Sequence, residues 1–195
     1  MTTCADWISP GTGPGYEYRY NPPAADGAKV ILTDTDHLWG HGSEVGWIWK
    51  SFTRGLNVLF MDPWEPIPGT LPRWIQGGVS LNQRYYHAWD PMRRNMGYTR
   101  RYADRMDLRR AVPHDDLCTS TYCLANPGHE YLCFFPAGGH EGVDLWDTAG
   151  TFVVEWFDPG TGRTYAGEAI EGGRRNALSA PFPGPAVLYV AASGS

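Results

Sequence analysis

Two apolar segments near the start of the chain each run into acidic residues. Residues 29–33 (KVILT) lead to Asp34 and Asp36, and residues 57–61 (NVLFM) lead to Asp62. A short apolar run of this kind is typical of a strand buried on both faces. We therefore predict two neighbouring parallel strands joined by a helix. Their acidic residues should meet at the carboxyl ends, where (β/α) barrels place their active sites.

A helical pattern of apolar residues lies between these two strands, and a second one follows further along the chain. Ser43 is a candidate N-cap of the first helix, and Gly55 is a candidate C′ residue. Asp90 and Pro91, an N-cap and N1 pair, predict a second helix that ends near Asp107. The apolar faces at a 3.6-residue period are Trp47, Ile48, Ser51 and Phe52 in the first helix, and Met92, Met96, Ala103 and Met106 in the second.

From Cys118 onward the pattern changes to a period of two. Turn signals rich in glycine and proline separate the short candidate strands. These strands are residues 121–125, 130–135, 142–145, 151–157, 163–167, 176–179 and 186–191. In the clearest of them, Phe152, Val154 and Trp156 should be buried between two sheets, while Glu155 should face solvent. This spacing predicts a small antiparallel β-sandwich.

Composition and charge exclude several functional classes. The net charge of −5 offers no electrostatic footprint for nucleic acid or for an anionic membrane. No run of about eighteen apolar residues exists, so no membrane span is predicted. The start, MTTCADWISPG, lacks the regions of a signal peptide, and a cytoplasmic location is the expectation. The glycines and prolines of residues 1–28 predict a loop.

The four cysteines, Cys4, Cys118, Cys123 and Cys133, form no CxxC pair. A disulfide between Cys123 and Cys133 would be compatible with pairing of their strands. Buried free thiols are the favoured interpretation, because cysteine often serves as a small apolar residue in a core.

Three stretches carry a resemblance to a known family. VILTDTDHLWG, WIWKSFTRGLNVLFMDP and MGYTRRYADRMDL resemble the last two βα units of apiosidase-like glycoside hydrolases, which have a (β/α)₈ barrel. The tail, from STYCLANPGHEYLCFFPAGG to APFPGPAVLYV, resembles the β-sandwich that follows such barrels and carries the label "collagen-binding domain of a collagenase". The resemblance covers nearly the whole chain from Ala5. It implies an α/β plus all-β fold: a partial barrel at residues 1–112 and a β-sandwich at residues 113–195.

The resemblance also indicates what such a chain would lack. A complete barrel needs about 250 residues, and these motifs match only its seventh and eighth strands. Retaining glycosidases use two carboxylates about 5–5.5 Å apart. By the resemblance, the nucleophile follows strand seven at Asp34 or Asp36, where the family usually has glutamate. The acid/base follows strand four, which has no counterpart here, so hydrolysis is expected only in a completed barrel.

The candidate site lies at the ends of the two predicted parallel strands. Asp36 is the first candidate for a catalytic acid and Asp34 the second. The candidate substrate-binding residues are His37, Trp39, Asp62 and Trp64. Carboxylates and histidine can bond sugar hydroxyls, and tryptophans can stack on a sugar ring. The structural alternatives are that Asp34 or Asp36 caps a turn or pairs with an arginine, that Asp62 forms an Asx-Pro turn, and that the tryptophans pack in a core.

A metal site is a further alternative. Asp34, Asp36, His37, His41 and Glu44 are chemically competent ligands, but their spacing matches no strong motif. We expect neither a metal nor a cofactor.

Two hypotheses follow for the whole chain. The first is a C-terminal fragment of a glycoside hydrolase that acts on a carbohydrate. The second is a non-catalytic carbohydrate- or protein-binding module, or an inactive gene fragment. The expected partner is a carbohydrate, with no nucleic acid and no membrane. Open edges of an incomplete barrel also predict self-association or recruitment of the missing barrel half. Residues 113–195 should then fold without the rest.

Overall fold

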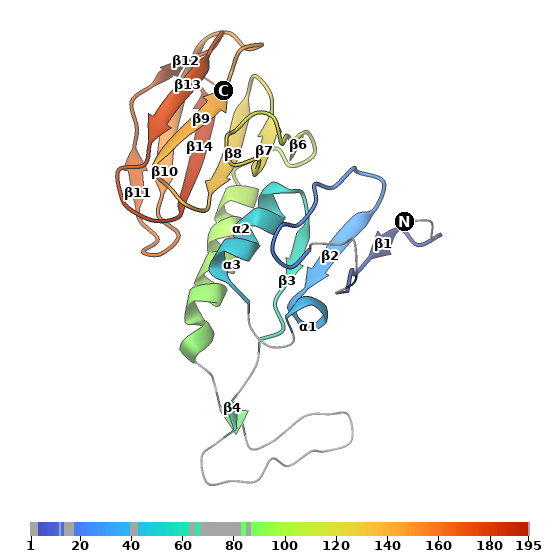
Figure 1. Ribbon diagram of the computed structural model, residues 1–195. Coiled ribbons are helices and arrows are strands. Elements are labelled where there is room, and N and C mark those ends of the chain that lie inside the picture. The colour runs from blue at the N-terminus through green and yellow to red at the C-terminus, as the bar shows by residue number, and fades with distance from the viewer. Residues whose placement is uncertain are drawn as a thin grey trace.

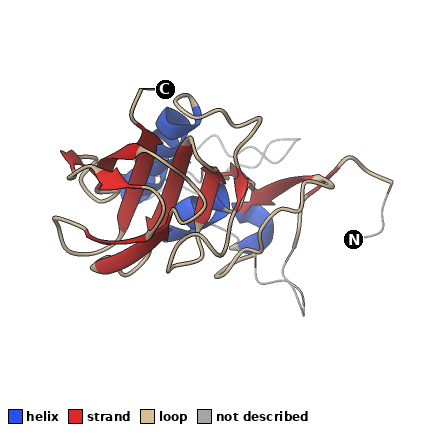
Figure 2. Cartoon of the chain, turned by 90° about the horizontal axis from the view of Figure 1, so that it is seen from above, coloured by secondary structure: helices blue, strands red, loops and turns tan. Residues whose placement is uncertain are grey.

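Two helices, α2 (Val45–Thr53) and α3 (Asp90–Ala103), lie between a small parallel sheet and a larger antiparallel sheet (Figure 1). The computed structural model describes residues 4–11, 13, 18–39, 43–62, 65–66, 83–84 and 87–194. Strands make up most of the regular structure of these residues and helices are few, as the view from above also shows (Figure 2). None of the helices in this described part is long and apolar enough to cross a membrane.

The small sheet has the order β1 (Trp7–Ile8), β2 (Val30–Asp34) and β3 (Asn57–Leu59). β2 and β3 are parallel, which confirms the prediction made from their apolar runs. β1, also parallel to β2, corrects the expectation of a loop throughout residues 1–28. A strand of two residues is too short to show a period, and it exists because it pairs with β2.

The helices agree with their predictions in type but not at every boundary. Gly55 has φ +71°, so it occupies the left-handed C′ position after α2 that was predicted for it. The N-cap of α2 is Glu44, without a capping side-chain hydrogen bond, so the assignment to Ser43 is wrong. The N-cap of α3 is Trp89, so the assignment of the cap to Asp90 is wrong: the helix begins at Asp90, has Pro91 in its first turn and ends at Ala103, short of Asp107. Its buried face consists of Met92, Asn95, Thr99 and Tyr102.

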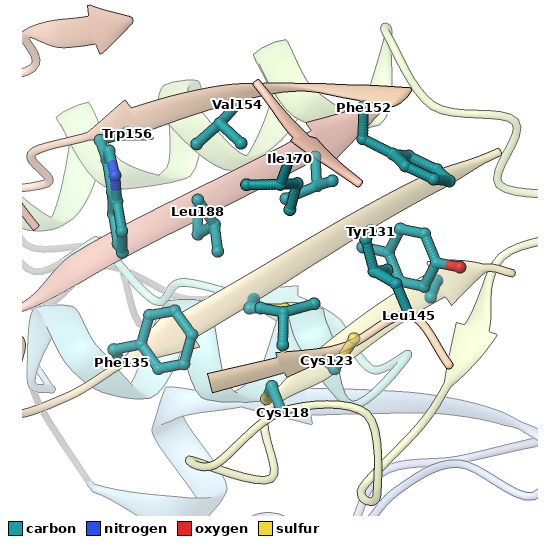
Figure 3. Close-up of a cluster of buried hydrophobic side chains, with 14 of the residues drawn as sticks. Cys118, Cys123, Tyr131, Phe135, Leu145, Phe152, Val154, Trp156, Ile170 and Leu188 are labelled. Atoms are coloured by element: carbon teal, nitrogen blue, oxygen red, sulfur yellow. The ribbon is translucent and has the colours of Figure 1, made fainter. Parts of the chain in front are cut away.

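The large sheet has the strand order β11-β10-β14-β8-β7-β6, with β12 also paired to β10. Its strands are β6 (Val112–Pro113), β7 (Cys123–Asn126), β8 (Glu130–Phe135), β10 (Thr151–Phe157), β11 (Thr164–Ala166), β12 (Ile170–Glu171) and β14 (Ala186–Ala192). A separate antiparallel pair, β9 (His140–Asp144) with β13 (Arg175–Ser179), contributes Val143 and Leu178 to the core on one face of this sheet. Phe152, Val154 and Trp156 are buried in that core, as predicted (Figure 3).

The opposite face of the large sheet is covered by the helices. Trp49 of α2 and Tyr102 of α3 belong to one buried cluster with Leu132, Phe134 and Tyr189 of the sheet. All six residues of β8 are therefore buried. Two further short elements, helix α1 (Thr35–Leu38) and the 3₁₀ helix η1 (His87–Trp89), complete the described helical structure, and β4 (Glu65–Pro66) pairs with β5 (Gln83–Arg84).

This shared cluster changes two expectations. Glu155 does not face open solvent, because the end of α3 lies over it: its Oε1 accepts from the Tyr102 hydroxyl (2.8 Å) and from Arg105 Nη1 (2.7 Å). The cluster also weighs against separate folding of residues 113–195, because their large sheet would expose an apolar face without α2 and α3.

Candidate functional site

The candidate site begins where β2 turns into α1. Asp34 is the N-cap of this helix, and its Oδ1 accepts from the backbone N–H of Asp36 at 3.0 Å. The strand thus ends at Asp34, and the chain continues as a helix through Asp36. Capping satisfies a helix N–H that has no partner within the helix. Asp34 has the structural role named as its alternative, and Asp36 is exposed in the first helical turn.

The two strand ends and β1 converge at this point. Thr35 Oγ1 accepts from the backbone N–H of Met61 (2.9 Å), which ties the segment after β3 to α1. The exposed His37 shares a hydrogen bond of 2.9 Å with Ser9 Oγ, just beyond β1. The sequence-predicted residues Asp34, Asp36 and His37 therefore all lie at the carboxyl end of β2, beside its parallel neighbour β3.

Asp62 lies beyond the end of β3 and is paired with an arginine. Arg93 Nε donates to Asp62 Oδ2 at 2.9 Å, and Arg93 Nη1 donates to Asp90 Oδ1 at 2.8 Å. Asp90 in turn lies 3.1 Å from His87 Nδ1. A guanidinium between two carboxylates neutralises part of their charge and fixes their positions. Asp62 thus forms an ion pair, a role that sequence reasoning had considered for Asp34 and Asp36 only.

Trp39, the C-cap of α1, packs against other aromatic side chains. Its ring lies edge-on to Tyr20 (5.4 Å between centroids) and to Trp47 (6.4 Å), and the guanidinium carbon of Arg19 lies 4.6 Å from its centroid. These contacts favour the packing alternative for Trp39. Trp64 and His41 lie outside the described residues, and Glu44 is the N-cap of α2.

A second polar cluster, which sequence reasoning missed, lies where α3 ends on the large sheet. Glu130 accepts from the Asp107 backbone N–H (2.7 Å) and from the Tyr189 hydroxyl (3.0 Å), beside the Glu155 contacts with Tyr102. Burial, and then the hydrogen bond to Glu130, raises the pKa of Tyr189 to about 12. Burial and the Glu155 hydrogen bond likewise raise the pKa of Tyr102. With its partners in place, this cluster reads as a structural network.

Two clefts border α3, and Asp36 lines neither of them. A groove of ≈ 400 Å³ between β3, α3 and β7 is lined by Val58, Met96 and Leu124, among others. A second, of ≈ 450 Å³, lies between the starts of α2 and α3 and is lined by Arg94 and Asp158, among others. Neither brings two carboxylates to one substrate position.

Comparisons with known proteins show which fold the chain resembles. No family model matches the chain, and no curated protein matches it. The solved structures that resemble it include one titled "Glycoside hydrolase" (TM-score 0.63, 12% identity) and a glycoside hydrolase family 5 protein from Bacteroides vulgatus ATCC 8482 (TM-score 0.64, 14% identity). The chain has a glycoside hydrolase-like fold. Each likeness covers 88% of this chain but only 44% and 43% of those chains, so the chain spans less than half their length.

Proposed function

We propose that the chain is the C-terminal portion of a carbohydrate-active glycoside hydrolase that is hydrolytic only when its barrel is complete. Residues 1–112 would supply the last βα units of a (β/α)₈ barrel, and residues 113–195 a β-sandwich. The observation that carries the proposal is the uncovered face of the small parallel sheet. A closed barrel has no open strand edges and fills its interior with side chains.

The two faces of that sheet differ sharply. Ile31 and Thr33 point toward α2 and are buried, as the outer face of a barrel strand would be. The alternate positions point the other way. Val30 lies on this second face, together with its register partner Trp7 and with Leu59, the register partner of Asp34. These three side chains are 44–57% exposed. An apolar face this open suits the interior of a barrel whose other strands are supplied elsewhere.

Asp34 lies on this same face, because it is four residues from Val30 and is the register partner of Leu59. In a completed barrel, Asp34 and the adjacent Asp36 would thus border the mouth. Asp36 is the better candidate for the reacting carboxylate, since Asp34 already caps α1. Asp62 is held by Arg93 and is better suited to bind a sugar hydroxyl, with His37, Trp39 and Trp64 as further substrate contacts.

The finer family assignment rests on the sequence motifs. The apiosidase-like resemblance of residues 30–62 and the collagen-binding label of the tail both agree with a barrel followed by a sandwich. Neither names a sugar. The alternative function, a non-catalytic carbohydrate- or protein-binding module, is favoured by the engagement of Asp34 and Asp62 in structural contacts.

The test compares the 195-residue chain with a version extended by whatever barrel portion the upstream reading frame encodes, about six more βα units. The chain alone should not turn over aryl glycosides, because one carboxylate of the pair is missing. The extended version should be active. Asp36→Asn should abolish that activity, and Asp147→Asn, at an exposed turn after β9, should not. An extended chain that binds a glycan but shows no Asp36-dependent turnover would support the binding module instead.

A further inference from the structure

Three cysteine thiols converge inside the core between the large sheet and the β9–β13 pair. The sulfur atoms of Cys118, Cys123 and Cys133 all lie within 4.8 Å of one another. Cys118 is 4% exposed, and the other two are fully buried. Figure 3 shows Cys118 and Cys123 within the apolar cluster that also contains Phe135 and Leu145. Among the described residues, these three are the side chains with metal-binding atoms that lie close enough together to hold one ion.

The backbone brings the three residues together by two different routes. Cys123 and Cys133 are direct register partners on the antiparallel strands β7 and β8, so their side chains point to the same face. Cys118 arrives from a separate segment, which forms an isolated bridge to Val143 of β9. The position of Cys118 therefore depends on the turn between it and Cys123.

That turn is strained and anchored. Thr121 has φ +67°, a left-handed conformation that is unfavourable for a β-branched residue. Arg54 Nη2 donates to Thr121 Oγ1 at 2.9 Å, and the Thr121 backbone N–H donates to Cys118 O at 3.2 Å. Ser120 Oγ donates to Phe134 O at 2.6 Å and lies 3.2 Å from Cys118 Sγ. These hydrogen bonds thus stabilise a backbone turn of unfavourable conformation, and this turn places Cys118 against the other two thiols.

We propose that Cys118, Cys123 and Cys133 form a thiolate site for one thiophilic metal ion of the Zn²⁺ or Cu⁺ class. Soft sulfur ligands select these ions. With Zn–S bonds of about 2.3 Å and tetrahedral angles, neighbouring sulfurs would stand about 3.8 Å apart, within the observed limit of 4.8 Å. A disulfide would use only two of the three sulfurs, and a Cys123–Cys133 disulfide would not need the strained turn that places Cys118.

The net charge of such a site depends on the ion that it binds. Three thiolates around Zn²⁺ carry a net charge of −1, the same as a Cys₃His zinc site, and the Ser120 hydroxyl or a water could take the fourth position. Cu⁺ needs no fourth ligand but leaves a net charge of −2. Because the thiols are buried, the ion would enter as the chain folds.

The experiment refolds the full chain under reducing, oxygen-free conditions with one equivalent of Zn²⁺, Co²⁺ or Cu⁺ and then removes loosely bound metal by gel filtration. We expect one equivalent to remain, as measured by elemental analysis, and Co²⁺ should show a thiolate-to-metal charge-transfer absorption band. Retention of Zn²⁺ and Co²⁺ identifies a zinc-type site, and retention of Cu⁺ alone a copper site. Cys118→Ala should lose the bound metal, whereas Cys4→Ala, at an exposed cysteine, should keep it.

Counting thiols in the denatured, metal-free protein gives an answer even if Cys118→Ala does not fold. The proposal requires all four cysteines to react and metal to protect three of them in the native chain. A chain that reacts with two fewer thiols after isolation without reductant, and binds no metal, contains a disulfide. A chain with four reactive thiols and no retained metal holds buried free thiols. Either result overturns the proposal.

Discussion

Trp49 offers the sharpest test of how the helices and the large sheet depend on each other. Its side chain is fully buried between α2 and the sheet, with ring centroids 5.9 Å from Tyr102, 6.4 Å from Phe134 and 5.8 Å from Phe157. Its indole N–H donates to Asn95 Oδ1 of α3 at 2.8 Å. Replacing Trp49 therefore removes both a packing contact and a buried hydrogen bond that join α2 to its neighbours.

The magnitude follows from these two losses. Truncation of a buried tryptophan to alanine costs about 3–5 kcal/mol through lost transfer energy and the cavity. An unsatisfied buried acceptor, here Asn95 Oδ1, adds about 1–3 kcal/mol where it cannot find water. Trp49→Ala should thus lower the free energy of unfolding by about 5 kcal/mol, against a total of about 5–15 kcal/mol for a typical protein. Trp49→Phe keeps a ring and isolates the hydrogen-bond loss.

The assay combines urea unfolding, followed by circular dichroism, with hydrogen exchange resolved to peptides. We expect one shifted transition and weaker protection in β8 and β14 as well as in α2 and α3, because all four elements share one buried cluster. Trp146→Ala, at a tryptophan that is 69% exposed, is the matched control and should change the stability by no more than about 0.5 kcal/mol. Unchanged protection in β8 and β14 of Trp49→Ala would refute the shared-core argument and restore two separately folding parts.

Three further predictions follow from named side chains. The full chain should self-associate through its open sheet face, so Leu59→Lys should shift it toward monomer in light scattering, and Val153→Lys, on another exposed strand position, should not. The folded state holds the Tyr189 proton up to a pKa of about 12, against 10.0 for the ordinary group. The stability from this shift is complete below pH 10 and is lost as the pH rises toward 12, so alkaline unfolding of Tyr189→Phe should show a flatter slope. Gly55→Ala, at φ +71°, should cost about 1–2 kcal/mol in thermal unfolding, whereas Gly97→Ala, inside α3 with open space around it, should not destabilise.

Local patterns predicted the elements because each pattern acts over a few residues. The apolar runs at 30–32 and 58–61 gave strands, and the alternation around Val154 gave the buried face of β10. Gly55 marked the end of α2 because a left-handed C′ position favours a residue without Cβ. β1 was missed because its two residues become a strand only through pairing with β2.

For the candidate site too, the sequence predicted where residues lie, and the tertiary structure determined what they contact. The sequence by itself placed Asp34, Asp36 and His37 after a parallel strand, since strand ends are a local signal. Only the tertiary structure decided their roles: Asp34 caps α1, and Arg93, thirty-one positions from Asp62, holds that carboxylate. The same holds for Glu155, whose neighbours are Tyr102 of α3 and Arg105 in the turn that follows it. Contacts between distant segments depend on how the helices and sheets pack against each other. A local sequence pattern does not show which residues of another element will lie over a given side chain.

The three thiols show this limit most clearly. The sequence determined that four cysteines are present without a CxxC pair, and it favoured burial for them as apolar residues, which is correct for all but the exposed Cys4. Pairing of β7 with β8 set Cys123 opposite Cys133, and the left-handed turn at Thr121 brought Cys118 to both. Strand register and turn geometry are set by the packing of the two sheets, so the convergence of the sulfurs exists only in the folded chain.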